Sequence, residues 1–321
     1  MSRIAGISYY LPKNVLTNKD LSEIFPEWSE TKIYEKTGIV ERHIAEDNEF
    51  VSSMAVKSAR KLFLDYEINP NTIDFLLLCT QSPDYFLPTT ACLVQNELNL
   101  PKSCGALDFN LGCSGFVYGL SLAKALIYSE NYNNVLLITS ETYSKYLNKD
   151  DKSVRTIFGD AAAATLVTNS KEGIGKFVFG TDGSGGDKLI VQNGALRSLN
   201  NKQYNVPILY MSGPDIFTFS LDVVPKLVFD ILKKNELYIE NIDLFILHQA
   251  NKFMLEHLKQ KLNIDDKKFF ISMSNCGNTV SSTIPIAIKE AQLNQVLRPN
   301  MKVLIAGFGV GYSWGGTIID F

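Results

Sequence analysis

The chain has 321 residues, of which 45% are hydrophobic and 20% are charged, and its formal net charge is −3. This balance excludes the strongly basic surface that nucleic-acid binding requires, and no apolar run approaches the roughly 18 residues of a membrane span. The amino-terminal stretch alternates like a strand and lacks the apolar core of a secretory signal. The five cysteines show no CxxC spacing and predict neither disulfides nor a metal site, so we expect a reduced, cytoplasmic protein.

Strand patterns alternate with helical patterns along the chain. Continuous apolar runs, typical of strands covered on both faces, lie at 73–80, 134–140, 162–168, 242–248 and 302–308. Helical periodicity lies at 52–66, 113–130, 213–235, 252–262 and 279–294. The alternation predicts a layered α/β architecture.

The pattern repeats at a nearly constant offset. The stretch IDFLLLCTQ begins at 73 and IDLFILHQA at 242, an offset of 169, whereas NVLLITSE at 134 and KVLIAGFG at 302 are offset by 168. The helix that opens at Cys113 corresponds in the same way to Ser281. These matches predict two similar halves, 1–169 and 170–321, joined near 167–175. The alternative is that these similarities arise by chance, because the buried strands of any α/β protein resemble one another.

A duplicated fold would bring equivalent strand ends and helix starts together around a pseudo-two-fold axis. His248, at the end of one predicted strand, and the NCGNTVSS segment that follows it would then lie within reach of Cys113. Ligands of α/β proteins bind at such strand ends. The sequence therefore predicts one site assembled from both halves.

Cys113 lies in DFNLGCSGF, at the start of an apolar helical pattern. A helix start favours negative charge, so this position predicts a lowered thiol pKa and a reactive thiolate. The alternative is an inert buried cysteine, which is the more common situation for a free thiol.

Three further positions are candidates for the same site. His248 is either a catalytic imidazole or a satisfied core histidine, and Asn278 is either an amide donor to a developing oxyanion or a turn residue. The segment GFGVGYSWGG (307–316) is predicted to be a glycine-rich hairpin that lines a tight site, with Gly309 against the substrate and a backbone N–H available as a donor.

Six motifs, in order, resemble the β-ketoacyl-acyl-carrier-protein synthase III group of the thiolase superfamily. In chain order they are TGIVERHIAED (37–47), CSGF, IFGDAAAATLV (157–167), HQAN, GNT and GFGVGYSWGG. The resemblance runs from about residue 3 to 321 and implies a duplicated αβαβα thiolase-like fold with two mixed five-stranded sheets, usually in a homodimer.

The resemblance also implies roles for individual residues. Cys113 would accept the acyl group, His248 and Asn278 would activate a malonyl thioester, and the backbone N–H groups of Cys113 and Val310 would form an oxyanion hole. The implied reaction is a decarboxylative Claisen condensation of a starter acyl thioester with malonyl-acyl-carrier protein. No cofactor is implied beyond the phosphopantetheine thioesters of acyl-CoA or acyl-carrier protein.

The chain departs from the family pattern at the expected substrate-binding positions. Lys32 and Lys36 stand where a Trp and an Arg of the coenzyme A clamp are usual, and Lys152 is the basic residue ahead of FGD. Lysine cannot stack on adenine as tryptophan does, which favours delivery of the starter by acyl-carrier protein or a specialised starter.

Two other departures concern the carrier protein and the glycine-rich hairpin, and one further segment matches the family. Phe253, next to Lys252, replaces an Arg that commonly meets the carrier protein, and Val310 replaces a glycine. Phe86 and Leu87 lie in the stretch 82–90, which resembles the segment that closes the partner subunit's acyl pocket. Two alternatives to the condensing enzyme stay open: a thiolase-fold O- or N-acyltransferase of secondary-metabolite or surface-glycan synthesis, and a degenerate partner subunit.

Overall fold

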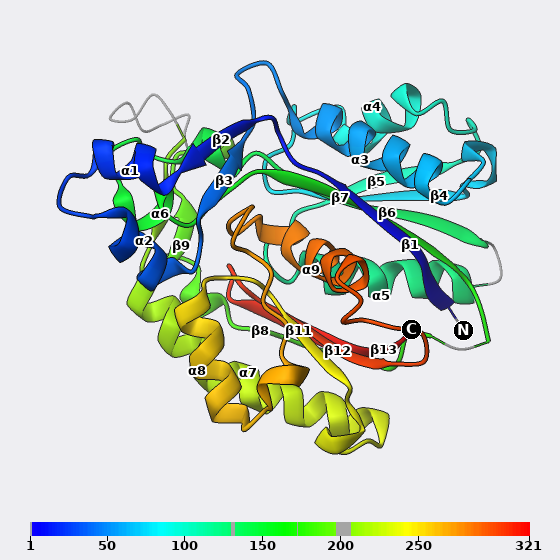
Figure 1. Ribbon diagram of the computed structural model, residues 1–321. Coiled ribbons are helices and arrows are strands. Elements are labelled where there is room, and N and C mark those ends of the chain that lie inside the picture. The colour runs from blue at the N-terminus through cyan, green and yellow to red at the C-terminus, as the bar shows by residue number, and fades with distance from the viewer. Residues whose placement is uncertain (1, 130–131, 172, 197–206) are drawn as a thin grey trace.

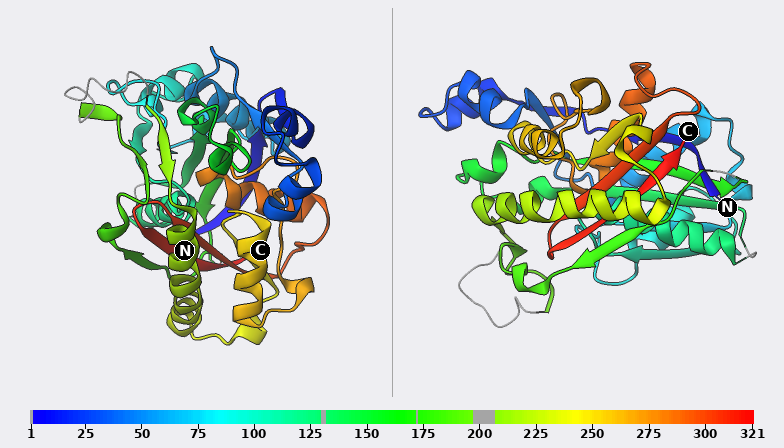
Figure 2. Two further views of the ribbon diagram at one scale, coloured as in Figure 1. Left: turned by 90° about the vertical axis from the view of Figure 1, so that its left-hand side faces the viewer. Right: turned by 90° about the horizontal axis from the view of Figure 1, so that it is seen from below.

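The computed structural model describes residues 2–129, 132–171, 173–196 and 207–321. Two mixed β-sheets alternate with three layers of helices, so that the order is helix, sheet, helix, sheet, helix (Figure 1). This is the thiolase-like αβαβα arrangement expected from the sequence. The first strand begins and the last strand ends on the same side of the molecule (Figures 1 and 2).

The first sheet has the strand order β1-β7-β6-β4-β5. The central strands β4 and β6 pair in parallel, β4 also pairs in parallel with β5, and β7 runs antiparallel to both β6 and β1. The strands are β1 Ser2–Tyr10, β4 Phe75–Cys79, β5 Gly105–Phe109, β6 Asn134–Glu141 and β7 Ala161–Asn169.

The second sheet has the strand order β11-β12-β13-β8. These strands correspond, in that order, to β4, β6, β7 and β1 of the first sheet. Phe75 pairs with Val135 in the first sheet and Leu244 with Val303 in the second, so the repeat predicted from the sequence is also a repeat of strand register. The strands are β8 Val178–Thr181, β11 Leu244–Leu247, β12 Lys302–Gly309 and β13 Ser313–Asp320.

The prediction of five strands in each sheet is wrong for the second sheet. Among the described residues this sheet has four strands, and beside β11 a single parallel bridge from Phe245 to Phe269 takes the place that β5 has in the first sheet. The division into 1–169 and 170–321 stays a prediction, and residue 172 within the predicted connector lies outside the described residues.

The three helical layers differ in how much of each helix is buried. The middle helices α5 and α9 are covered by a sheet on both sides, and Phe116, Leu120, Ile284 and Ile288 are completely buried in the core cluster there. A helix that faces a sheet on two sides needs a wide apolar surface, although both helices also keep exposed positions, such as Leu122 and Leu293. The helices are α3 Val51–Asp65 and α4 Thr90–Glu97 above, α5 Gly115–Tyr128 and α9 Thr283–Leu293 between, and α7 Gly213–Asn235 and α8 Lys252–Leu262 below.

The predicted helices at 113–130 and 279–294 are shorter than expected at their starts. α5 begins at Gly115, two residues after Cys113, and a 3-10 turn, Val280–Ser282, precedes α9. Residue 130 lies outside the described residues. The amino ends of both middle helices are therefore loops, and these loops carry polar side chains into the interface between the halves.

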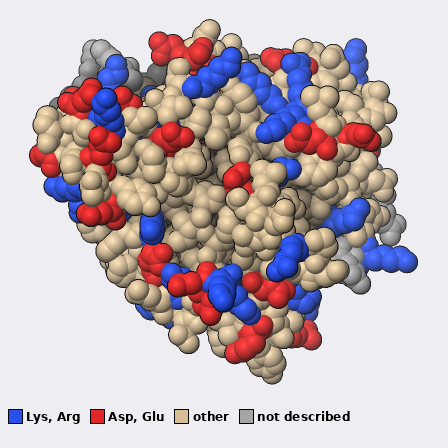
Figure 3. Space-filling model, viewed as in Figure 1, with Lys and Arg blue, Asp and Glu red and all other residues tan. Residues whose placement is uncertain are grey.

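Smaller elements surround one end of the layered core. They are β2 Asn14–Thr17, α1 Asn18–Ile24, α2 Glu30–Thr37, β3 Glu41–Ile44, α6 Lys152–Arg155, β9 Leu189–Val191 and β10 Leu209–Met211. On the face shown in Figure 3, acidic and basic side chains are interspersed. None of the described helices has both the length and the apolar character needed to traverse a bilayer.

Candidate active site

Four of the residues singled out from the sequence line one cavity of about 100 Å³. They are Cys113, His248, Asn278 and Gly309, and they come from both halves of the chain. Cys113 follows β5, His248 follows β11, and Gly309 ends β12, so the cavity lies at the carboxyl ends of strands from the two sheets. The structure brings together the residues that the duplication predicted to meet.

The backbone around Cys113 is packed too closely for side chains on the adjoining strand. A Cβ atom added to Gly309 would lie 2.9 Å from Cys113 Sγ, and one added to Gly307 would lie 2.6 Å from the Cys113 carbonyl oxygen. The hydroxyls of Ser114 and Ser313 are hydrogen-bonded at 2.7 Å. The glycines of β12 thus let this strand pass directly beside the thiol.

The pKa of Cys113 does not follow the sequence-based expectation. Burial raises the pKa of the thiol to about 12, because removing water destabilises the thiolate. Hydrogen bonds from the backbone of Val310 and of Cys113 itself lower it, but by less than burial raises it. The prediction of a thiolate stabilised by the helix start is therefore wrong for the free protein: Cys113 precedes α5 by two residues and is only 5% exposed.

His248 is neutral at physiological pH. Burial lowers the pKa of its imidazole to about 3, because the charged form cannot be solvated there. Its Nδ1 lies 2.7 Å from Thr283 Oγ1, and its backbone N–H donates to the Ala306 carbonyl at 2.8 Å. Within the described residues Nε2 has no hydrogen-bond partner, and the side chain lines the cavity.

Asn278 is held by hydrogen bonds on both sides of its amide. Its Oδ1 accepts from the Val280 N–H at 2.9 Å, and its Nδ2 donates to the Ala250 carbonyl at 3.3 Å. The Asn278 N–H donates to the Ile157 carbonyl at 2.9 Å, which ties this loop to the FGD segment. One hydrogen of Nδ2 remains for a ligand in the cavity.

Glu141, at the end of β6, is a buried residue that the sequence reasoning missed. Its Oε1 accepts from the Ser281 hydroxyl at 2.7 Å, and its Oε2 accepts from the Gln81 N–H at 3.0 Å and the Ser82 hydroxyl at 3.1 Å. Burial raises the pKa of its carboxyl to about 8, although these hydrogen bonds lower it in part. The sequence feature that could have indicated a buried glutamate is its place at the end of an apolar strand, LLITSE.

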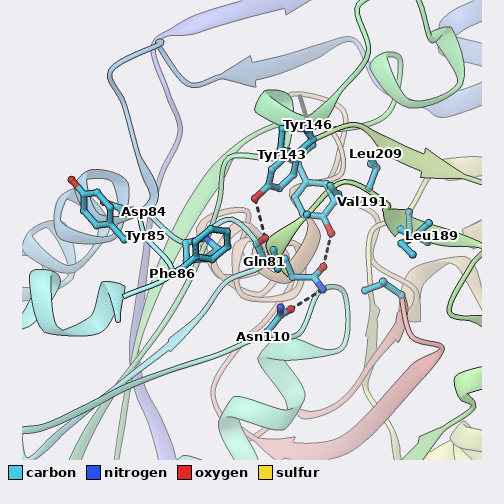
Figure 4. A pocket seen from close by; sticks show the side chains of 16 residues that line it. Gln81, Asp84, Tyr85, Phe86, Asn110, Tyr143, Tyr146, Leu189, Val191 and Leu209 are labelled. Carbon is cyan, nitrogen blue, oxygen red and sulfur yellow. Dashed lines mark hydrogen bonds between the residues drawn. The ribbon is translucent and has the colours of Figure 1, made fainter. Parts of the chain in front are cut away.

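A second and larger cavity, of about 730 Å³, lies against the same segment. Val310 lines it, and a Cβ added to Gly112 would lie 2.6 Å from Val310 Cγ1, so the cavity adjoins the residue before Cys113. Figure 4 shows this pocket with Gln81 between two tyrosines and Asn110. Phe86 lines the pocket and is 81% exposed; Leu87 is 82% exposed and is not among the lining residues.

The three predicted substrate-binding lysines gather around one tryptophan. The Nζ atoms of Lys32, Lys36 and Lys152 lie 5.4, 5.7 and 5.6 Å from the centre of the Trp28 ring. Lys152 also pairs with Glu27 at 2.6 Å. Sequence reasoning missed Trp28, although it lies only four residues before Lys32 in the chain.

Lys252 and Phe253 open α8 on the outside of the site. Phe253 is 52% exposed and stacks on Phe217 at 5.5 Å, and Lys252 Nζ lies 5.8 Å from the ring centre of Tyr34. Their neighbours in sequence, Asn251 and Met254, line the smaller cavity. Among the described residues no group of three or more His, Cys, Asp and Glu side chains could hold a metal ion.

Comparisons with known proteins agree with this architecture. Models of 3-oxoacyl-[acyl-carrier-protein (ACP)] synthase III and of its C-terminal part match residues 107–183 and 232–321. A β-ketoacyl-[acyl-carrier-protein] synthase III of Clostridium perfringens is 37% identical over 322 residues, covering 99% of this chain and 98% of that protein.

Solved structures give the same result. A 3-oxoacyl-(acyl-carrier-protein) synthase III aligns with a TM-score of 0.98 and 46% identity, covering 100% of this chain and 99% of that one. The enzyme of Aquifex aeolicus aligns with a TM-score of 0.91 and 33% identity over 100% of both chains. Fold and comparisons together define a condensing acyltransferase with a thiolase-like fold. The chain belongs to the 3-oxoacyl-[acyl-carrier-protein] synthase III family.

Glu141 makes folding stability depend on pH. Because its folded pKa of about 8 lies above the ordinary glutamate value of 4.5, the native state binds the proton more tightly, and stability falls as pH rises between these values. We expect the unfolding free energy of Glu141→Gln to fall less steeply, the difference in slope being up to about 1.4 kcal/mol per pH unit. Denaturant titrations across this window measure it. The other carboxyl groups contribute equally to the pH dependence of both proteins and cancel in the difference. Equal slopes of unfolding free energy against pH would therefore contradict the raised pKa of Glu141.

The raised pKa of Cys113 predicts a steep pH dependence of alkylation. Since only the thiolate reacts, its carbamidomethylation rate should rise about tenfold per pH unit from about pH 7 to about 9.5 without a plateau. Peptide mass spectrometry of the alkylated chain separates Cys113 from the exposed Cys92. A plateau below about pH 8 would instead indicate a stabilised thiolate.

Proposed function

We propose that the enzyme loads a starter acyl group onto Cys113 and condenses it with malonyl-acyl-carrier protein to give a 3-oxoacyl product. The observation that carries this proposal is the single cavity into which Cys113, His248 and Asn278 project from the two halves of the chain. A thiol, a neutral imidazole and a primary amide supply one nucleophile and two hydrogen-bond donors, and no strong base.

In the first half-reaction the Cys113 sulfur attacks the carbonyl carbon of the starter thioester. The new C–S bond forms, the old one breaks, and the Cys113 proton goes to the departing thiol. The carbonyl oxygen becomes an oxyanion, which we place against the backbone N–H groups of Cys113 and Val310. The hydrogen bonds from these two backbone groups, which lower the pKa of the thiol, support this placement.

In the second half-reaction malonyl thioester loses CO2 and leaves an enolate. Its carbon attacks the acyl carbonyl, the bond from that carbonyl to the Cys113 sulfur breaks, and the departing thiolate takes up one proton from solvent. The enolate oxygen needs donors, and Asn278 Nδ2 has a free hydrogen. For His248, the hydrogen must be on Nε2, which requires Thr283 to donate to Nδ1. That hydroxyl also donates to the Val280 carbonyl at 3.1 Å, so this tautomer of His248 needs the Thr283 hydrogen to turn to Nδ1, at 2.7 Å.

We propose that the basic residues around the site bind the carriers of the acyl groups. Trp28, with Lys32, Lys36 and Lys152 around its ring, offers a flat aromatic surface and three positive charges for an adenine nucleotide of coenzyme A. Lys252 and Phe253, exposed at the start of α8, are placed to meet acyl-carrier protein, whose prosthetic group would enter past Asn251 and Met254.

We also propose a cytoplasmic homodimer that needs no further cofactor. The side chains of Phe86 and Leu87 are 81% and 82% exposed, which is unusual for large apolar groups that have no partner. A second copy of the chain that covers them would bury this surface and would close the larger cavity, which Phe86 lines.

The two half-reactions can be separated with variants. Intact-mass analysis with a panel of acyl-CoA and acyl-carrier-protein donors should give an acyl adduct on the wild type and none on Cys113→Ala. CO2 release from malonyl-acyl-carrier protein should fall by at least about a hundredfold in His248→Ala and Asn278→Ala, while Cys113 still acylates. Equal adducts on wild type and Cys113→Ala would refute the nucleophile, and undiminished CO2 release would favour the O- or N-acyltransferase.

Trp28 provides a separate test of coenzyme A recognition. Trp28→Ala should raise KM for acyl-CoA about tenfold, because base stacking on an aromatic ring is lost. The matched comparison is the same acyl group on N-acetylcysteamine, which carries no nucleotide and should be used equally by both proteins. An unchanged KM for acyl-CoA would place the nucleotide elsewhere.

A further inference from the structure

The larger cavity has one polar side in an otherwise apolar lining. Leu189, Val191 and Leu209 supply apolar surface, whereas Gln81, Asn110 and the hydroxyl of Tyr143 face them from the other side (Figure 4). Val310 is a further apolar residue of the lining. Asp84 also lines the cavity, but its carboxylate is occupied by the backbone and hydroxyl of Ser52 at 3.1 and 2.5 Å. An unsubstituted alkyl chain gains nothing from such a polar side.

The three polar side chains form one directed hydrogen-bond chain. The Tyr143 hydroxyl donates to Gln81 Oε1 at 2.5 Å, and Gln81 Nε2 donates to Asn110 Oδ1 at 3.0 Å. The free end of the chain is the Asn110 Nδ2 group, which has no partner among the described residues. Unused N–H donors therefore remain on Asn110 and Gln81, while the oxygens of the chain keep lone pairs that can accept from a ligand hydroxyl.

Gln81 and Tyr143 are held in place beside the nucleophile, whereas Asn110 is exposed. The Gln81 backbone N–H donates to buried Glu141 at 3.0 Å, and the Gln81 carbonyl accepts from Tyr146 at 3.2 Å. Tyr143 is 4% exposed. A Cβ added to Gly112 would lie 2.5 Å from Gln81 Oε1, which places the amide against the residue that precedes Cys113. Its position is thus fixed from the backbone side by packing and by Glu141.

We propose that Gln81, Asn110 and Tyr143 select starter acyl groups that carry an oxygen acceptor on the chain, either a hydroxyl or a carbonyl. This inference rests on the proposed function, in which the acyl group on Cys113 extends into the larger cavity. An oxygenated chain accepts a hydrogen bond from the Asn110 or Gln81 amide, whereas an alkyl chain of the same size strips water from these donors without replacing it. Sites built to bond a substrate oxygen discriminate strongly against the analogue that lacks it.

The test compares isosteric donors with the complete enzyme. The probes are N-acetylcysteamine thioesters in two pairs, 3-hydroxybutyryl with 3-methylbutyryl and 4-hydroxybutyryl with pentanoyl, and intact-mass analysis gives the acylation rate of Cys113 for each. The wild type should favour the oxygenated member of at least one pair by about tenfold or more. Gln81→Leu should abolish or reverse this ratio.

Leu209→Ala is the matched control, because Leu209 lines the same cavity and takes no part in the hydrogen-bond chain. It should change both rates of a pair together and keep their ratio. Two results would overturn the inference. One is a wild type that prefers the alkyl member of both pairs. The other is a Gln81→Leu enzyme that accepts longer acyl groups at an unchanged ratio of rates, because Gln81 would then limit only the length of the acyl group. Failure of every donor to acylate Cys113 would count against the proposed function instead.

Discussion

The structure depends on the burial of two helices between two sheets. α5 and α9 contact both sheets and the core cluster between them, so their orientation cannot change without loss of that packing. The loops that open these helices carry Cys113 and Asn278, and polar contacts across the halves join the same region: Ser114 with Ser313, Thr139 with Ser282, and Glu141 with Ser281. The two buried helices therefore fix the positions of Cys113 and Asn278.

The same burial determines the electrostatics of the site. Removing water raises the pKa of Cys113 and of Glu141 and lowers that of His248, so the three groups favour their neutral forms. Neutral groups can exchange hydrogen bonds and protons with thioesters without the desolvation penalty of buried charges. Lys32, Lys36, Lys152 and Lys252 are at least partly exposed around the site.

Part of the site was readable from short motifs, and part was not. Cys113, His248 and Asn278 stand at the ends of recognisable strands or starts of helices, and the duplication predicted that they meet. The Cys113 pKa was predicted in the wrong direction, because a helix start is a local feature and desolvation depends on everything packed around the thiol. Trp28 and Glu141 were missed because their partners, Lys152 and Ser281, lie more than a hundred residues away in the chain.

The amino-acid sequence by itself determined the layered class, the order of five strands and five helices, the repeat between the halves and the motifs of the family. These follow from periodicity and from residue types at fixed spacing, which are properties of short segments. Only the tertiary structure decided that the second sheet keeps four described strands, that the site groups are neutral, and that Gln81, Asn110 and Tyr143 form one polar side of the larger cavity. The physical reason is that burial and hydrogen bonding between distant segments exist only after the two halves have packed together.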